Sequence, residues 1–138
     1  MHVCCAVIYN EVDGTDCDFN DILEHHVGYG FDYFTSADED EKMVKRFKGL
    51  ILEEGVENEY VYDIDGIKFA YKAKVDDVDW EKTFELCDIC SFANSSMFID
   101  DWLFYDNKKS KYNTKEFYKL MKRVIDRNEM IQVVDIHV

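Results

Sequence analysis

Proline is absent from this 138-residue sequence, and its first 41 residues contain neither lysine nor arginine. The same 41 residues hold 11 aspartates and glutamates, and the whole chain has a formal net charge of −14. Charge of this size repels nucleic acid and anionic membranes, and it attracts basic surfaces. We therefore expect no direct binding to nucleic acid or to a membrane, and we expect a basic protein as the partner.

Long apolar runs are also missing. The apolar stretch at residues 1–9 has no basic flank, and it is shorter than a membrane-spanning helix or a signal sequence requires. The five cysteines are an odd number, which favours free thiols in a reducing compartment over a disulfide framework. We expect a cytoplasmic protein.

The composition nevertheless predicts a folded core. Hydrophobic residues make up 47% of the chain and aromatic residues 15%, far more apolar area than a disordered chain carries. A chain of this length buries roughly two-thirds of its unfolded surface on folding, which suits one core better than two. The expectation is a single globular domain over residues 1–138.

Two capping boxes mark the starts of the clearest expected helices. The first, at residues 36–39, opens a helix whose apolar residues keep helical spacing through residue 51, and Gly55 follows as a stop. The second, at residues 113–116, opens a helix that carries an apolar stripe as far as residue 125. Both helices are predicted to pack this stripe against a sheet.

Two further helices are expected. A third begins near Asp77 or Asp79, and a short fourth covers residues 19–27. The third helix is predicted to present one apolar face made of Trp80, Phe84, Cys87 and Ser91.

The dipeptide Asp65-Gly66 predicts a β-hairpin with a type I′ turn, which pairs Ile64 with Ile67. That register places aromatic residues opposite one another on one face and opposite charges on the other, as expected of stabilising cross-strand pairs. The predicted pairs are Tyr62 with Phe69, Tyr60 with Tyr71, Asp63 with Lys68, and Glu59 with Lys72.

Strands are also expected over residues 2–9, 97–105 and 130–137, which gives the order β-α-α-β-β-α-β-α-β. This order predicts an α+β (mixed α/β) fold with about five strands in one sheet, packed by three to four helices. The first and last strands are apolar on both faces, so they are expected at central positions of the sheet.

Cysteine and histidine could supply zinc ligands, because Cys87 and Cys90 form a C-x-x-C pair. No second pair with metal-binding spacing accompanies them, and Cys87 continues the apolar stripe of Trp80. A redox motif of this kind begins a helix after a strand, whereas this pair is expected deep within a helix. The other candidate zinc ligands are Cys4, Cys5, Cys17, His25 and His26. We favour packing of Cys87 in the core, and we predict a reduced protein without metal or cofactor.

The oxygen-rich stretch at residues 11–21 invites a calcium interpretation. On an EF-hand template that starts at Asp16, the first ligand positions fit, but Asp21 replaces the turn glycine and Val27 replaces the bidentate glutamate. The template therefore fails, and a loose divalent-cation site is left as the alternative.

Two short motifs are candidates for hidden catalysis. His25-His26 could supply a general base, although His26 is expected to pack on an apolar face and adjacent helical residues point about 100° apart. Asp100 and Asp101 interrupt an apolar run, and one of them could face a covered side of the sheet. A bulge, a bend or an edge-strand charge explains the aspartates without catalysis.

The leading hypothesis is a small acidic inhibitor that blocks the basic, nucleic-acid-binding surface of an effector or nuclease. An anti-CRISPR-like anti-defence protein or a toxin immunity protein fits this description. The rival is a metal-assisted hydrolase that uses Asp100, Asp101, His25 or His26, and a structural subunit that forms a homodimer is a third possibility. The expected partner-binding carboxylates are Glu11, Asp13, Asp16, Asp18, Asp21, Glu24, Asp76, Asp77 and Asp79.

Overall fold

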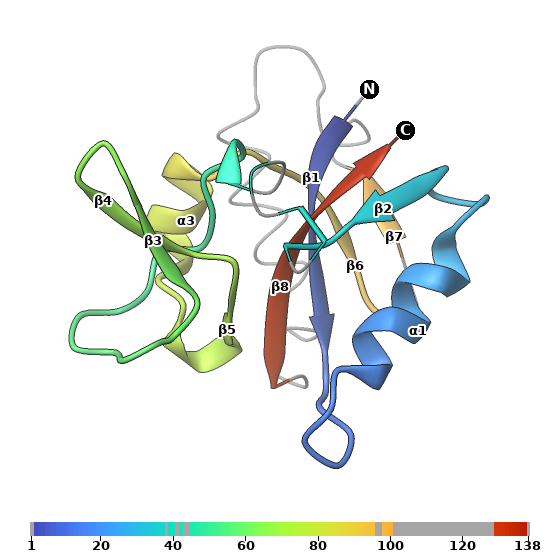
Figure 1. Cartoon of the computed structure of the whole chain (residues 1–138), viewed down its shortest axis with the longest axis horizontal. Helices are drawn as coiled ribbons and strands as arrows, with labels where there is room; N and C mark the ends of the chain where they lie inside the picture. The colour runs from blue at the N-terminus through green and yellow to red at the C-terminus, as the bar shows by residue number, and fades with distance from the viewer. Residues whose placement is uncertain are drawn as a thin grey trace.

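The computed structural model describes residues 2–37, 39–40, 42, 45–95, 98–100 and 129–137. Within them, a six-stranded sheet has the order β2-β8-β1-β6-β7, and β5 also pairs with β8 (Figure 1). The strands of this sheet are β1 (His2–Tyr9), β2 (Tyr33–Thr35), β5 (Lys72–Lys74), β6 (Ile89–Ala93), β7 (Phe98–Asp100) and β8 (Met130–His137).

The centre of the sheet is the antiparallel pair β1 and β8, whose register runs from His2 opposite His137 to Tyr9 opposite Met130. The predicted central positions of these two strands are confirmed. The outer edge of β8 is shared, because β5 pairs with its first three residues and β2 with its last three. The other edge of β1 pairs in parallel with β6.

The hairpin forms a separate two-stranded sheet of β3 (Val61–Ile64) and β4 (Ile67–Ala70). Its predicted register is confirmed: Ile64 lies opposite Ile67, and the next pairs are Asp63 with Lys68 and Tyr62 with Phe69. Asp65 and Gly66 both have positive φ, as a type I′ turn requires. The Tyr60 and Tyr71 rings lie 5.3 Å apart, as the register predicts.

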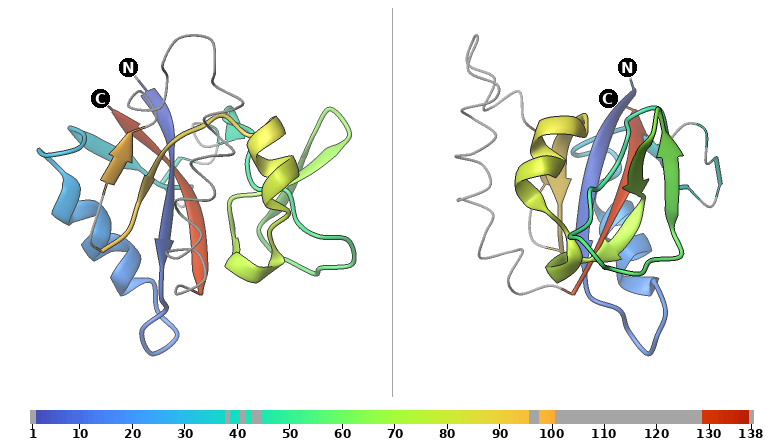
Figure 2. Two further views of the ribbon diagram at one scale, coloured as in Figure 1. Left: turned by 180° about the vertical axis from the view of Figure 1, so that it is seen from behind. Right: turned by 90° about the vertical axis from the view of Figure 1, so that its left-hand side faces the viewer.

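The faces of the main sheet carry two different apolar clusters. On one face, α1 (Cys17–His26) packs Phe19, Ile22 and Leu23 against the alternate β1 residues that begin with Cys5. The opposite face packs against α3 (Trp80–Leu86), the 3-10 turn η1 (Val75–Asp77) and the segment around Leu50. Figure 2 shows α1 and α3 on opposite sides of the sheet.

The expectation of three to four helices around one sheet is wrong. The described residues contain two α helices, α1 and α3, against eight strands in two sheets, so the fold is dominated by sheet. The expected helix over residues 113–127 lies outside the described residues. The expected strand over residues 97–105 is described only as β7, because residues 101–105 are also outside them.

The expected helix does not reach residue 51. Residues 42 and 45 are helical, but residues 46 and 47 form a turn and Lys48 has φ of 68°. Leu50 then pairs with Ala70 of the hairpin in an antiparallel bridge, and a Cβ on Gly49 would lie 2.8 Å from the carbonyl oxygen of Ala70. Leu50 and Ile51 are therefore buried from non-helical backbone, because tertiary contacts override local propensity.

The third expected helix is present but shorter. Asp79 caps α3 by accepting a 3.0 Å hydrogen bond from the Lys82 amide, and Trp80 and Phe84 contact each other as predicted. The helix ends at Leu86, so Cys87 is its C-cap and Ser91 lies in β6. Cys87 is buried with Trp80 in the core, which confirms the packing interpretation, although the C-x-x-C pair does not lie within a helix.

Candidate functional site

Acidic residues from the first 41 positions and from the region around residues 75–77 meet at one end of the main sheet. The amide of Asn10, just after β1, donates to the Asp18 carboxylate at the start of α1 (3.0 Å). The side-chain oxygen of Asn10 accepts from the Glu129 amide (2.9 Å), and the Glu129 carbonyl accepts from the Val75 amide (2.9 Å). The loop after β1, the start of β8 and η1 are thereby adjacent at the lower end of Figure 1.

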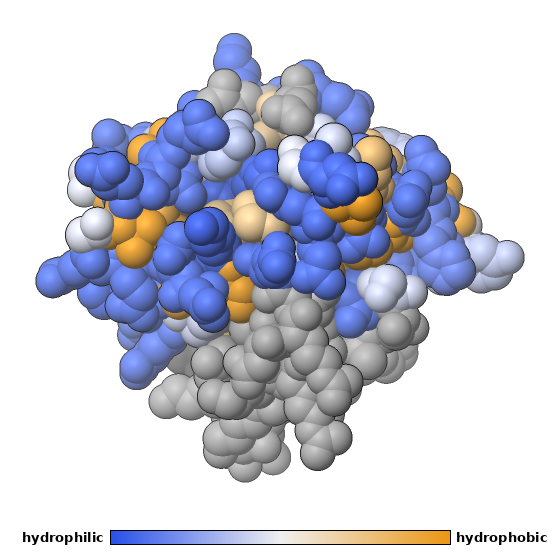
Figure 3. Space-filling model, turned by 90° about the horizontal axis from the view of Figure 1, so that it is seen from below, coloured by the Kyte–Doolittle hydropathy of each residue, from blue (hydrophilic) through white to orange (hydrophobic). Residues whose placement is uncertain are grey.

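This end exposes carboxylates that are more than 50 residues apart in sequence. We define the acidic end as the exposed Glu11, Asp13, Asp21, Asp76 and Glu129 together with the half-buried Asp18 and Asp77. The predicted partner-binding residue Glu24 is exposed in the last turn of α1. Lys74 is an exposed cation on the neighbouring β5. Viewed from below in Figure 3, the surface of the described residues is mainly hydrophilic and carries only small apolar patches.

Asp16 and Asp79, two of the predicted partner-binding residues, have structural roles. The Asp79 carboxylate caps α3, as described above. Asp16 accepts hydrogen bonds from the Lys72 amine at 2.8 and 3.0 Å and from the Gln132 amide at 3.0 Å. Its carboxylate therefore tethers the loop after β1 to β5 and β8 and contributes little to the exposed surface.

Lys72 and Tyr9 complete this internal polar network. The Lys72 amine lies 5.1 Å from the centre of the Tyr60 ring, and the Tyr9 hydroxyl accepts from Gln132 at 2.9 Å. Burial favours the neutral amine, but the hydrogen bond and charge of Asp16 outweigh it, so the pKa of Lys72 is raised. The predicted pair of Lys72 with Glu59 is replaced by the pair with Asp16.

Burial raises the pKa of the Tyr9 hydroxyl well above its ordinary value of 10.0. A raised pKa in the folded state contributes stability below the unfolded pKa, and that stability is lost as pH rises further. We predict that the free energy of unfolding falls as pH rises above about 10, because the unfolded state releases the Tyr9 proton first. Lys72 acts in the same direction, since its pKa is raised from 10.5.

Denaturant unfolding at pH 8 to 11, compared with the Tyr9→Phe variant, measures this effect. Tyr9→Phe is expected to flatten the alkaline fall in stability. Tyr29→Phe is the matched control, because that side chain is 92% exposed and meets water in both states. An alkaline profile that is identical for Tyr9→Phe and the unchanged chain contradicts the prediction.

Of the rival catalytic residues, the structure describes the side chains of the two histidines alone. His26 is buried, as predicted, and its Nε2 lies 2.9 Å from the backbone oxygen of Asn94. His25 is exposed beside it, with ring centres 5.1 Å apart. Asp100 pairs through its backbone with Ser91, and its side chain and the whole of Asp101 lie outside the described residues.

The calcium interpretation of residues 11–21 gains nothing from the structure. Val12 and Thr15 close a tight turn in which Asp13 and Gly14 have positive φ. Within the described part of the chain, no cluster of three or more His, Cys, Asp or Glu side chains is placed to hold a metal ion. Among the cysteines described there, Cys4, Cys5 and Cys87 are buried and Cys17 is exposed.

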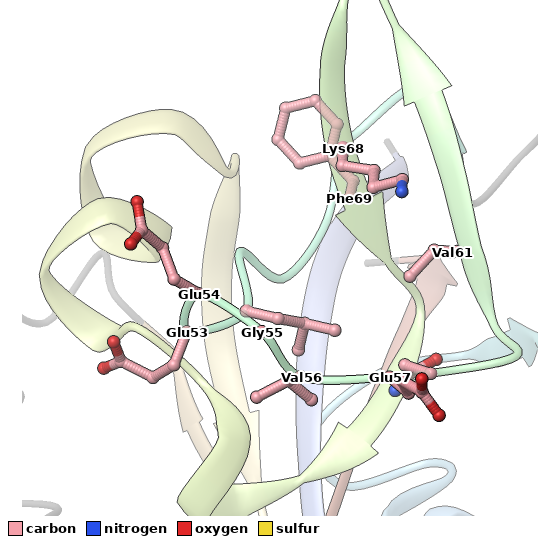
Figure 4. A pocket seen from close by; sticks show the side chains of 10 residues that line it. Glu53, Glu54, Gly55, Val56, Glu57, Val61, Lys68 and Phe69 are labelled. Carbon is pink, nitrogen blue, oxygen red and sulfur yellow. The ribbon is translucent and has the colours of Figure 1, made fainter.

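A groove of about 590 Å³ lies between the loop after Leu52 and the hairpin (Figure 4). Glu53 and Glu54 point away from the hairpin, and Lys68 lies on the opposite wall. None of the rival catalytic residues lines this groove. The backbone amide of Glu53 donates to the carbonyl of Asp77 (2.9 Å), so the groove adds acidic residues beside η1.

A second polar cluster, which the sequence analysis missed, lies at the opposite end of β1 and β8. His2 and His137 are cross-strand partners there, and Tyr33 lies opposite His137 on β2. Asp32 and Asp135 contact the two histidines. Only the antiparallel register of the two terminal strands brings these residues together, and no local sequence motif signals it.

Comparison of the chain with protein-family models, with curated proteins and with solved structures found no match. Within the described residues, no helix is long and apolar enough to cross a membrane. Inference about function therefore depends on the geometry and charge of the surface.

Proposed function

We propose that this chain is an acidic binding protein that occupies the basic, nucleic-acid-binding surface of a partner protein. The observation that carries the proposal is the convergence of residues 10–18, residues 75–77 and Glu129 at one end of the sheet. Carboxylates placed together in this way can occupy phosphate positions and accept charge-assisted hydrogen bonds from arginine and lysine. A basic surface engaged like this is blocked for nucleic acid.

Burial and pairing within the acidic end support this function. The Lys72 amine lies 2.8 Å from Asp16 and 3.9 Å from Glu11, so these two carboxylates take up its charge and Asp13, Asp21 and Asp76 do not.

A displacement assay with defined probes tests the proposal. An arginine-rich peptide is bound to a fluorescent DNA duplex, and the protein is added at low ionic strength. We expect the protein to release the DNA from the peptide, with release weakening steeply as salt is added. The protein alone is expected not to shift the duplex in a gel.

Three results contradict the proposal. One is direct binding of the isolated protein to the duplex. Another is turnover of a phosphoester with added Mg²⁺ or Mn²⁺ that is lost on mutation of Asp100 or Asp101, which supports the hydrolase instead. Release of DNA that is equally strong at high and low salt also argues against an electrostatic surface.

A further inference from the structure

Two histidines face each other at the far end of the sheet. His2 of β1 and His137 of β8 are opposite each other in the antiparallel register, and their ring centres lie 5.2 Å apart at an interplanar angle of 75°. Metal–nitrogen bonds of about 2.1 Å at a tetrahedral angle place two imidazole centres about 5 Å apart. The observed spacing therefore matches two rings that share one ion.

Carboxylates orient both rings. Nδ1 of His2 lies 3.1 Å from Oδ1 of Asp135, and Nδ1 of His137 lies 3.1 Å from Oδ2 of Asp32. When Nδ1 of a neutral imidazole donates to a carboxylate, the lone pair of the ring is on Nε2. This is the arrangement in which metal-binding histidines are held by second-layer carboxylates.

The surroundings keep the pair ordered and accessible. The His137 ring stacks on Tyr33 at 4.7 Å and 7°, which restricts its rotation. The side chain of Asp135 is only 1% exposed, and Nη2 of Arg46 lies 3.8 Å from its Oδ2. The His2 and His137 side chains remain 32% and 30% exposed, so an ion can reach them from solvent.

We propose that His2 and His137 bind a divalent transition-metal ion through their Nε2 atoms. Imidazole ligands select Zn²⁺, Ni²⁺ or Cu²⁺ over Mg²⁺ and Ca²⁺, which prefer oxygen. Because no third His, Cys, Asp or Glu converges on a metal position among the described residues, water or a ligand completes the coordination. The site is independent of the acidic end.

Calorimetric titration with Zn²⁺ alone tests this site in the full-length protein. We expect one equivalent to bind, and we expect His2→Gln and His137→Gln each to weaken binding at least tenfold. His25→Gln is the matched control, because it removes an exposed histidine from α1 and is expected to leave the affinity unchanged. Mg²⁺ is expected to produce no binding heat at the same concentrations.

The variant Asp32→Asn tests the orienting role without disturbing a buried group. We expect a loss of affinity of about tenfold to a hundredfold, as is usual when a carboxylate behind a metal-bound histidine is removed. Electron paramagnetic resonance of the Cu²⁺-loaded protein is expected to show two coordinated imidazole nitrogens, and only one in His137→Gln. Zinc affinity that survives His137→Gln in folded protein, or that is lost in His25→Gln, overturns the proposal.

Discussion

Replacing Lys72 by methionine is expected to lower the free energy of unfolding by about 3 kcal/mol. Lys72 is 11% exposed and holds both oxygens of Asp16, at 2.8 and 3.0 Å. Methionine keeps most of the apolar stem but leaves the carboxylate without its cation. Removing one partner of a buried ion pair costs about 3–5 kcal/mol, and the 28% exposure of Asp16 places this pair at the lower limit.

Lys68→Met is the matched control for this change. Lys68 is exposed on the hairpin and lies opposite Asp63, so its loss is expected to change stability by no more than about 0.5 kcal/mol. Urea denaturation of both variants measures the difference. The double variant Asp16→Asn with Lys72→Met is expected to lose less stability than the sum of the single changes. Equal losses for Lys72→Met and Lys68→Met contradict the assigned role of the buried pair.

Neutralising three carboxylates of the acidic end is expected to weaken binding to the arginine-rich peptide about tenfold. The changes are Asp13→Asn, Asp21→Asn and Asp76→Asn, all at exposed positions. Asparagine has nearly the same shape as aspartate, so each change removes the charge and little else. Each exposed charge contact contributes roughly 0.2–1 kcal/mol, so three together account for a change of this size. Asparagine also tolerates the positive φ of Asp13.

A control triple variant separates a local surface from net charge. Glu39→Gln, Asp63→Asn and Asp65→Asn remove the same charge from exposed positions outside the acidic end. We expect the control variant to bind the peptide within about twofold of the unchanged chain at physiological salt, where charges beyond about 8 Å are screened. If both triple variants lose affinity equally, binding depends on total charge and the acidic end is not a specific surface.

Parts of the fold could be predicted because short-range chemistry determines them. The hairpin register follows from Asp65-Gly66 and from the pairing of Tyr62 with Phe69, which are all within a few residues of the turn. The central position of β1 and β8 follows from apolar residues on both faces, because only a strand covered on both sides tolerates them. The capping of α3 by Asp79 is likewise a local signal.

Other segments could not be predicted because their partners are distant. Apolar residues at helical spacing predict a helix through residue 51, but the pairing of Leu50 with Ala70 ends the helical backbone before that residue. The sequence pattern predicts that Ser91, which lies in β6, continues the third helix. The residues of β6 form a strand instead because they pair in parallel with β1, and no local sequence pattern shows that pairing.

Four features follow from the amino-acid sequence: the large negative charge, the absence of cations from the first 41 residues, the hairpin and the identity of the two central strands. Which charges are exposed and which side chains meet depends on the tertiary fold. Asp16 became an internal partner of Lys72 across 56 residues, and the histidines of β1 and β8 came into contact through an antiparallel register. Turn chemistry acts within a few residues, and composition can be counted without a structure. The contacts of Asp16 and of the histidines instead depend on strand pairing between distant residues, which only folding of the whole chain establishes.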